Sequence, residues 1–224
     1  MSRRAARIVA VALAFAAAGL ALALALAADE QAMDQRLKEV DPLLRELEKT
    51  SRQFHNVPRE HGQFLRMLVE MSGAKNALEV GTSNGYSGIW IGLGLEKTGG
   101  KLTTIEIVPE IAAKARENFK KAGMDDIITC ITGDALKVIP TLDEEFDFVF
   151  LDAVKSDYWR YFELVRPKLK DGAVLAAHNA VSMRRAMSKY FEIVQNSPDM
   201  ITTVVAIEPR DGIAVTYVRK VPEK

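Results

Sequence analysis

The segment from Ala77 to Ser87, ALEVGTSNGYS, constrains the fold of this chain more than any other stretch of its sequence. A short apolar run leads into a turn that contains Gly81 and Gly85, and helical residues resume near Tyr86. A strand, a glycine turn and a helix in this order form the cradle in which α/β proteins hold a nucleotide-like ligand. Gly81 permits a positive φ and a close approach of the backbone, and the helix amides point towards an anionic group.

The spacing of the glycines indicates which ligand this turn accepts. A dinucleotide site requires G-x-G-x-x-G, because the pyrophosphate contacts the backbone at two close points. The glycines of this chain are Gly81, Gly85 and Gly88, which fit that pattern poorly. Together with Glu79 they give E-x-G-x-x-x-G, the spacing of proteins that bind S-adenosylmethionine (SAM). The motif therefore favours SAM over NAD, and a glycine turn without a ligand is the alternative.

The composition excludes nucleic acid as a partner. Lys and Arg balance Asp and Glu, so the formal net charge is zero, and no global attraction to nucleic acid or to acidic membranes is expected. No run of basic residues interleaved with aromatic residues marks a nucleic-acid surface. Cys130 is the only cysteine, so an internal disulfide is impossible. Its apolar neighbours predict a buried, unreactive side chain.

The amino terminus has the pattern of an export signal or a membrane anchor. Basic residues at positions 3, 4 and 7 precede an unbroken apolar run from Ile8 to Ala28. A signal peptide has an apolar middle of about 7–15 residues and an A-x-A exit, which residues 25–27 supply. The run is also long enough to span a bilayer, which takes roughly 20 residues. We predict a signal peptide or anchor over residues 1–28 and one α/β domain with N-terminal helices over residues 29–224.

The charges around this run predict its topology. Basic residues before it, with Asp29 and Glu30 after it, place the amino terminus in the cytoplasm and the domain across the membrane. SAM is expected mainly in the cytoplasm, which conflicts with that orientation. Translation from Met33 would give a cytoplasmic protein without the segment. Export, membrane anchoring and a cytoplasmic location therefore stay open.

Strand and helix patterns alternate through the rest of the chain. Helical periodicity is present over residues 37–47 and 64–72. Further helices are expected over residues 86–95, 109–122, 158–169 and 182–191. Strands are expected over residues 77–80, 101–106, 127–132, 146–151, 173–177, 201–207 and 212–218. This alternation predicts a mostly parallel α/β sheet with helices on both faces and an antiparallel strand near one edge.

Acidic residues follow two of the predicted strands. Glu106 ends the second strand, where an acid accepts hydrogen bonds from ribose hydroxyls in nucleotide-binding α/β folds. The alternative for Glu106 is a solvated surface acid. Gly133, Asp134 and Ala135 follow the third strand, at the same edge of the sheet, where an adenine ring could lie. We expect Asp134 to cap the helix that follows it.

A second polar group is predicted at the ends of the fourth and fifth strands. Asp152 follows a wholly apolar strand, with Lys155 one turn later and Tyr158 beyond it, and His178 and Asn179 end the next strand. Oxygen and nitrogen donors on adjacent strand ends can converge on one divalent cation. The alternative makes His178 a hydrogen-bonded histidine and Asn179 a helix cap.

Two segments, EHGQFLRMLVEMSGAKNALEVGTSNGYS and FDFVFLDAVKSDY, give the chain a family resemblance. The chain resembles the cation-dependent O-methyltransferases of the catechol and caffeoyl-CoA type from about Phe54 to Val218. The resemblance implies a seven-stranded, Rossmann-like methyltransferase fold and methylation of a hydroxyl group, phenolic or catechol-like, on a small molecule. The SAM contacts that it implies are Val57, Glu79, Gly81, Thr82, Ser87, Glu106, Ala135 and Asp152.

The resemblance also implies the chemistry at the second polar group. Asp152 and Asn179 would ligate the metal, Lys155 would take the substrate proton, and the protein would form a homodimer. The family has Asp-Asn at the end of the fifth strand, whereas this chain has His178 and Asn179. If Asp152, His178 and Asn179 all bind a cation, Asp152 alone supplies negative charge.

The substituted histidine leaves several hypotheses open. Magnesium prefers hard, charged oxygen ligands, whereas imidazole suits zinc, iron, manganese or nickel. We therefore expect weakened magnesium binding, with a transition metal or no metal in its place. A metal-independent methyltransferase with His178 as base, or a membrane-associated SAM-binding protein without turnover, are the alternatives. Trp159, Met183 and the segment before Val57 are candidate residues of the acceptor pocket, and the sequence does not identify the acceptor.

Overall fold

The computed structural model describes residues 35–219. The predicted signal or anchor over residues 1–28 and the alternative start at Met33 lie outside the described residues. Within residues 35–219, every helix falls short of the length or the apolar character that crossing a bilayer requires. Residues 35–48 are helical, and the compact unit that contains the sheet begins at Leu43.

A seven-stranded sheet forms the centre of this unit, in the order β3-β2-β1-β4-β5-β7-β6. Its strands are β1 (Asn76–Val80), β2 (Lys101–Glu106), β3 (Ile128–Thr132), β4 (Phe146–Leu151), β5 (Leu169–Ala177), β6 (Met200–Glu208) and β7 (Asp211–Val218). The first five strands are parallel, and β7 is antiparallel to both of its neighbours. The predicted sheet, including the antiparallel strand near one edge, is confirmed.

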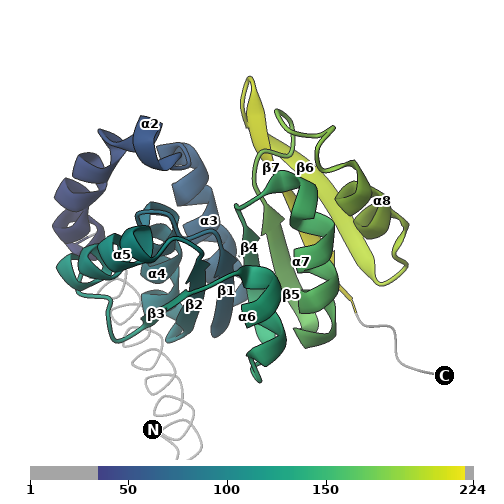
Figure 1. Ribbon diagram of the computed structural model, residues 1–224, viewed down its shortest axis with the longest axis horizontal. Helices are drawn as coiled ribbons and strands as arrows, with labels where there is room; N and C mark the ends of the chain where they lie inside the picture. The colour runs from purple at the N-terminus through teal and green to yellow at the C-terminus, as the bar shows by residue number, and fades with distance from the viewer. Residues whose placement is uncertain (1–34, 220–224) are drawn as a thin grey trace, which may run out of the picture. The chain divides into compact units, whose positions relative to one another are not determined.

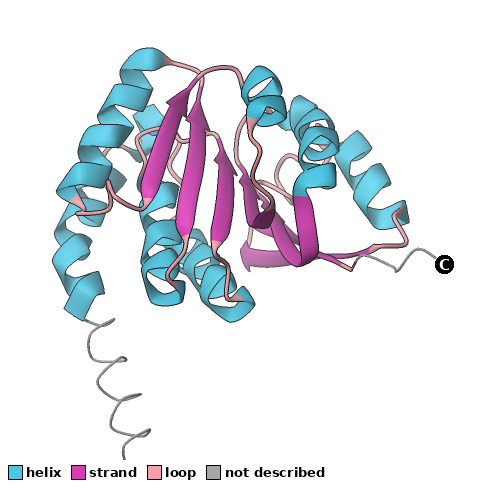
Figure 2. Ribbon diagram, turned by 90° about the horizontal axis from the view of Figure 1, so that it is seen from below, coloured by secondary structure: helices cyan, strands magenta, loops and turns pink. Residues whose placement is uncertain are grey.

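Helices cover both faces of the sheet (Figure 1, Figure 2). One face carries α3 (Arg59–Ser72), α4 (Tyr86–Thr98) and α5 (Pro109–Lys121). The other face carries α6 (Ala135–Val138), α7 (Tyr158–Val165) and α8 (Ser188–Asn196). A further short helix, α2 (Ser51–Phe54), precedes α3. Right-handed crossovers place α4 and α5, which connect β1 to β2 and β2 to β3, on one face. The chain then reverses direction across the sheet, so α6 and α7, on either side of β4, lie on the other face.

The central strand β4 shows why its neighbourhood is buried. Successive side chains of a strand point to opposite faces, and Phe148, Val149, Phe150 and Leu151 are all fully buried. Helices cover both faces of a parallel sheet, so a central strand is apolar throughout. The first polar side chain after this strand, Asp152, therefore emerges at the carboxyl edge of the sheet.

The strand order also fixes where a ligand can bind. β1 pairs with β2 on one side and β4 on the other, so the chain runs outwards from β1 in both directions. Crossover connections on either side of such a point diverge and leave a crevice at the carboxyl ends of the strands. A cavity of about 900 Å³ opens there, which is within the range of ligand sites.

The predicted helix over residues 182–191 is wrong in its first half. The helix α8 begins at Ser188, and residues 179–187 form turns. Asn179 has a positive φ of 58°, which a right-handed helix excludes. Asp211 accepts hydrogen bonds from the Asn179 side chain and the Ser182 amide, so a contact with the β6–β7 turn shapes this segment.

The predicted helix over residues 158–169 is also shorter than expected. The α-helical part ends at Val165, and a 3-10 turn over Arg166–Lys168 follows. Pro167 lies within that turn, where its missing amide removes a helical hydrogen bond. β5 accordingly begins at Leu169, four residues before the predicted start at Ala173.

Candidate active site

One end of the cavity lies at β1 and β2, and we call it the donor end after the predicted site of the methyl donor SAM. The other end lies at β4 and β5, and we call it the acceptor end after the predicted site of the methyl acceptor. Residues of the predicted SAM site that line it are Val57, Gly81, Thr82, Ser87, Glu106, Ala135 and Asp152. Residues of the predicted chemical group that line it are Asp152, Lys155, His178 and Asn179. The fold therefore brings together residues that are spread over most of the domain.

The turn after β1 requires glycine at position 81. Gly81 has a φ of 101°, which L-residues rarely adopt. A Cβ atom added to Gly81 would lie 2.3 Å from the backbone oxygen of Asp152. The turn therefore packs directly against the chain that leaves β4, and Thr82 beside it is buried with its hydroxyl 2.5 Å from that of Thr104.

The carboxylate of Glu106 is fixed at the end of β2. Its Oε2 accepts a 2.8 Å hydrogen bond from the Ser83 amide, and its Oε1 accepts a 3.0 Å hydrogen bond from the Val108 amide. Each carboxylate oxygen has two acceptor positions, so the group can still accept from a ligand hydroxyl in the cavity. The Ser83 hydroxyl donates to the Phe54 carbonyl at 2.6 Å, which ties the α2 segment to this turn.

Glu79 lies beneath the turn, outside the cavity lining. Its side chain is fully buried. Its two oxygens accept 2.6 Å hydrogen bonds from the hydroxyls of Ser87 and Thr104. Burial raises the pKa of Glu79 to about 7 against these two hydrogen bonds. Glu79 therefore braces α4 against β2 beneath the turn, and its contact with SAM stays a prediction.

Asp134 caps α6, as predicted. Its side chain accepts a 3.0 Å hydrogen bond from the Leu136 amide, which satisfies one of the free amides at a helix start. Asp134 and Ala135 line the cavity beside the end of β2. Trp159, in contrast, does not line the cavity, because its ring packs under Lys189, whose Nζ is 3.1 Å from the ring centroid.

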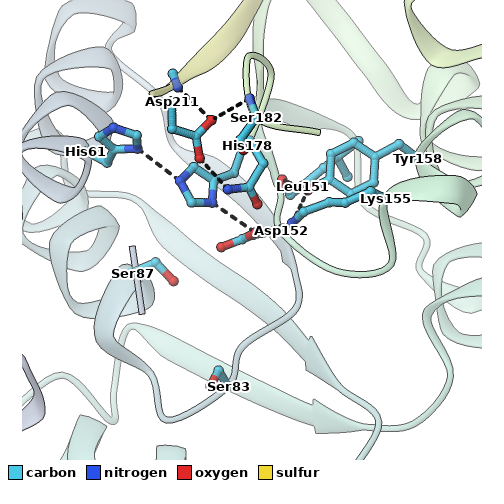
Figure 3. A network of polar contacts seen from close by, with 12 residues as sticks. His61, Ser83, Ser87, Leu151, Asp152, Lys155, Tyr158, His178, Ser182 and Asp211 are labelled. Carbon is cyan, nitrogen blue, oxygen red and sulfur yellow. Dashed lines mark hydrogen bonds and ion pairs between the residues drawn. The ribbon is translucent and has the colours of Figure 1, made fainter. Parts of the chain in front are cut away.

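Asp152 and Lys155 form an ion pair at the acceptor end. Lys155 Nζ donates to Asp152 Oδ1 at 2.6 Å and to the Tyr158 hydroxyl at 2.9 Å (Figure 3). Burial alone would raise the pKa of Asp152, but the charges and hydrogen bonds of His178 and Lys155 hold it well below its usual range. Burial raises the pKa of Tyr158 well above its usual value, and its hydroxyl donates to the Leu151 carbonyl.

His178 lies between two partners. Its Nδ1 is 3.1 Å from Asp152 Oδ1, and its Nε2 is 2.9 Å from His61 Nδ1 (Figure 3). His61 comes from α3 and is fully buried. Both ring nitrogens of His178 are thus engaged within the protein, so neither nitrogen is positioned to accept a proton from a substrate. The hydrogen-bonded histidine considered as an alternative describes this arrangement.

The third predicted metal ligand, Asn179, is also engaged. Its Nδ2 donates to Asp211 Oδ2 at 2.5 Å. Of the three side chains, only Asp152 Oδ2 and Asn179 Oδ1 have no hydrogen bond among the described residues. In the part of the chain that the structure describes, no cluster of three His, Cys, Asp or Glu side chains has the arrangement of a metal site. Asp152 Oδ1, both nitrogens of His178 and Asn179 Nδ2 are committed to partners within the protein, so the donor set as arranged does not fit a resident cation.

Sequence reasoning missed three residues that shape the site. His61 and Asp211 each contact a predicted site residue through their own side chains, and Ser83 donates its backbone amide to the Glu106 carboxylate. His61 lies within a segment that carries the family resemblance, but nothing in its spacing pairs it with His178. Asp211 reads as an ordinary turn residue in the sequence, and its role depends on the antiparallel pairing of β7 with β5.

Comparison with known proteins agrees with this geometry. Residues 22–215 match the model of a family described as O-methyltransferase. A catechol O-methyltransferase from Mycobacterium tuberculosis is 33% identical over 182 residues, which cover 73% of this chain and 80% of that protein. A catechol O-methyltransferase from Niastella koreensis is 38% identical over 130 residues, 56% of this chain and 58% of that protein. The chain therefore covers less than two thirds of the length of the Niastella relative.

Solved structures with the same fold contain the expected ligand. An O-methyltransferase from Bacillus cereus, in complex with S-adenosylhomocysteine (SAH), superposes with a TM-score of 0.72 at 29% identity, over 83% of this chain and 91% of that chain. The O-methyltransferase TomG from Streptomyces achromogenes, in complex with SAM, gives a TM-score of 0.71 at 28% identity, over 79% and 89% of the two chains.

Proposed function

Because this chain belongs to the O-methyltransferase family, we propose that it transfers a methyl group from SAM to a hydroxyl group of a small, phenolic acceptor. The observation that carries the proposal is the shared cavity, in which the Gly81 turn and Glu106 face the Asp152–Lys155 pair. The phenolic character of the acceptor is supported by the names of the catechol O-methyltransferases among the relatives.

The donor end holds SAM in this proposal. The carboxylate of Glu106 accepts hydrogen bonds from the ribose hydroxyls, and Val57 and Ala135 supply apolar surface for the adenine ring. The turn at Gly81 and Thr82 lets the backbone approach the amino-acid part of the ligand. SAM supplies a methyl group on a sulfonium, which is already a strong electrophile. The protein therefore has to align the reactants, which can contribute up to about 7–11 kcal/mol in the best intramolecular cases.

Lys155 is the proposed acceptor of the hydroxyl proton. As the acceptor oxygen bonds to the methyl carbon, the carbon–sulfur bond breaks, the electron pair stays on sulfur, and the hydroxyl proton passes to Lys155 Nζ, whose ammonium must first release a proton to solvent. The resulting ammonium is stabilised by Asp152 at 2.6 Å. Tyr158 stays a phenol because its pKa is raised well above the usual value. Its hydroxyl oxygen accepts a hydrogen bond from Lys155 Nζ and so orients that side chain.

The mouth of the acceptor end has apolar surface. Val154 and Met183 line the cavity and are about half exposed. Side chains of this kind suit the face of an aromatic ring, whereas Lys155 lies deeper, beside the strand end. We therefore place the acceptor ring against Val154 and Met183 with its hydroxyl towards Lys155. Membrane attachment through residues 1–28 and a homodimer stay predictions.

Two measurements on the purified protein test this function. Calorimetry with SAM and SAH tests the donor site, for which we expect one bound ligand per chain. A methyl-transfer screen over catechols and simple phenols, followed by mass spectrometry, tests the reaction. Methylated product with SAM binding supports the proposal. SAM binding without product from any acceptor supports a SAM-binding protein without turnover, and no binding of either ligand contradicts the proposal.

A further inference from the structure

We propose that this site works without a divalent cation, because the hydrogen-bonded series Asp152–His178–His61 uses the side-chain atoms that a cation would need. In this proposal His61 is the residue that positions His178. The inference rests on the proposed function and deepens it. The hydrogen-bonded chain runs from the end of β4 through the end of β5 to α3 (Figure 3).

His178 has no lone pair available to a metal in either of its protonation states. A carboxylate only accepts hydrogen bonds, so the contact with Asp152 places a proton on Nδ1 of His178. If the ring is neutral, the lone pair on Nε2 faces His61 Nδ1 at 2.9 Å. If the ring is charged, both nitrogens carry protons and no lone pair is left. In neither state does His178 offer a lone pair to a metal, which is what ligation by histidine requires.

His61 holds this arrangement from a fully buried position. Its ring meets the ring of His178 edge to face, with centroids 5.0 Å apart and an interplanar angle of 89°. Its other nitrogen, Nε2, is buried without a hydrogen-bond partner among the described residues. The contact with His178 is thus the hydrogen bond of the buried His61 ring.

The side-chain oxygen atoms that remain without a partner do not make up a cation site. Oδ1 of Asp152 is shared between His178 Nδ1 and Lys155 Nζ, so a cation at this oxygen would displace a nearby ammonium. Nδ2 of Asn179 is turned towards Asp211. This leaves Asp152 Oδ2 and Asn179 Oδ1, of which only the Asp152 oxygen carries charge, whereas magnesium prefers hard, charged oxygen ligands.

Without a cation, the protein itself has to orient the acceptor hydroxyl. A bound cation would orient the hydroxyl and lower its pKa, and here that task falls to Lys155. Lys155 is suited to it, because Asp152 and Tyr158 fix its Nζ at 2.6 and 2.9 Å. The acceptor is therefore a phenol that binds through one hydroxyl, and a second, adjacent hydroxyl is not required.

Manganese binding, followed by electron paramagnetic resonance, tests the inference without relying on activity. We expect the wild-type protein to leave the free Mn²⁺ signal unchanged, and His178→Asp to bind one Mn²⁺ per chain because it restores a second carboxylate. Asp152→Asn added to His178→Asp is the matched control and should abolish that binding. One Mn²⁺ bound by the wild type and lost in Asp152→Asn overturns the inference.

Variants at His61 test its positioning role. His61→Phe and His61→Gln remove or weaken the contact that fixes the His178 ring. The ring can then turn and present a lone pair beside Asp152 Oδ2 and Asn179 Oδ1, so both variants should gain Zn²⁺ binding that the wild type lacks. His55→Asn is the control, because it removes an exposed histidine at the cavity edge. Asparagine tolerates the positive φ at that position, so metal binding should not change. A purely structural role for His61 would change the melting temperature in both variants without any gain of Zn²⁺ binding, which contradicts the positioning role.

SAM calorimetry separates this inference from the proposed function. Wild-type protein that binds SAM and methylates an acceptor equally in EDTA and in Mg²⁺ supports both. Activity that is lost in EDTA and restored by Mg²⁺ overturns the cation-free site and leaves the methyltransferase intact. Absence of SAM binding overturns the proposed function instead. Simple phenols and catechols should be methylated with similar kcat/KM, and a requirement for the catechol contradicts the inference.

Discussion

The two ends of the cavity use their polar groups in opposite ways. At the donor end, the Glu106 carboxylate is held by backbone amides and keeps acceptor capacity for a ligand. At the acceptor end, Asp152, His178 and Asn179 direct their hydrogen bonds to Lys155, His61 and Asp211. A site that binds SAM can therefore keep its donor end while its metal position becomes an internal network. The difference can be tested one residue at a time.

The largest effect is expected at Lys155. Lys155→Met removes the proposed proton acceptor, and general-base catalysis contributes roughly 10²–10⁴-fold, so kcat should fall by that factor while SAM affinity stays unchanged. Methyl transfer and calorimetry measure the two quantities. Lys170→Met is the matched control, because Lys170 also pairs with an aspartate, Asp147 at 3.2 Å, but lies outside the cavity lining. Full activity of Lys155→Met would show that another group takes the proton.

The next effect concerns stability at the donor end. The pKa of Glu79 is raised from 4.5 to about 7 by burial. Between these values the native state holds a proton that the unfolded chain has released, so the free energy of unfolding falls as pH rises through this window. Glu79→Gln should abolish this dependence and should be more stable than wild type above pH 7, by on the order of 3 kcal/mol.

Urea unfolding of both proteins between pH 4 and pH 8 measures this difference. Glu79→Ala is the control, because it leaves the hydroxyls of Ser87 and Thr104 without their partner and should be destabilised at every pH. An equal pH dependence of wild type and Glu79→Gln would show that the Glu79 carboxyl ionises as freely in the folded protein as in the unfolded chain.

Glu106 should affect ligand affinity. Glu106→Gln removes the charge that strengthens its hydrogen bonds, and such bonds contribute about 1.5–3 kcal/mol, so the Kd for SAM should rise roughly 10- to 100-fold. The kcat at saturating SAM should change little. Glu110→Gln alters an exposed acid of α5 and should leave the Kd unchanged. An unaltered Kd in Glu106→Gln would mean that SAM binds elsewhere.

The smallest effect is expected at Asp134. Loss of an N-cap side chain costs about 1 kcal/mol, so Asp134→Ala should lower the free energy of unfolding by that amount. Asp134→Asn keeps a capping oxygen and should restore most of it. Chemical denaturation measures both. A stability unchanged in Asp134→Ala would show that α6 does not depend on this cap.

Local sequence patterns predicted most of the fold and the donor end. The apolar run before Gly81, the glycine spacing and the acid at the end of β2 each act within a few residues, and the structure places Gly81, Thr82 and Glu106 on the cavity. The pattern did not show how Glu79 is placed: side chains alternate across a strand, and the Glu79 carboxylate points under α4, where it accepts a hydrogen bond from Ser87.

The acceptor end could not be predicted in the same way. His61 and His178 are 117 residues apart in sequence, and Asn179 and Asp211 are 32 residues apart. Such contacts depend on how α3 and the β6–β7 turn pack against the ends of the central strands. The strand-end pattern supplied the positions of Asp152, His178 and Asn179, and the family resemblance implied ligand roles for Asp152 and Asn179. Only the packed structure shows that their hydrogen bonds are directed inwards.

A calorimetric titration of the full-length protein with SAH, repeated in EDTA and in excess Mn²⁺, tests the central claim most directly. We predict one site per chain with the same affinity in both conditions, because the donor end is complete and the acceptor end has no place for a cation. Absence of binding heat, or binding that requires Mn²⁺, would contradict this account.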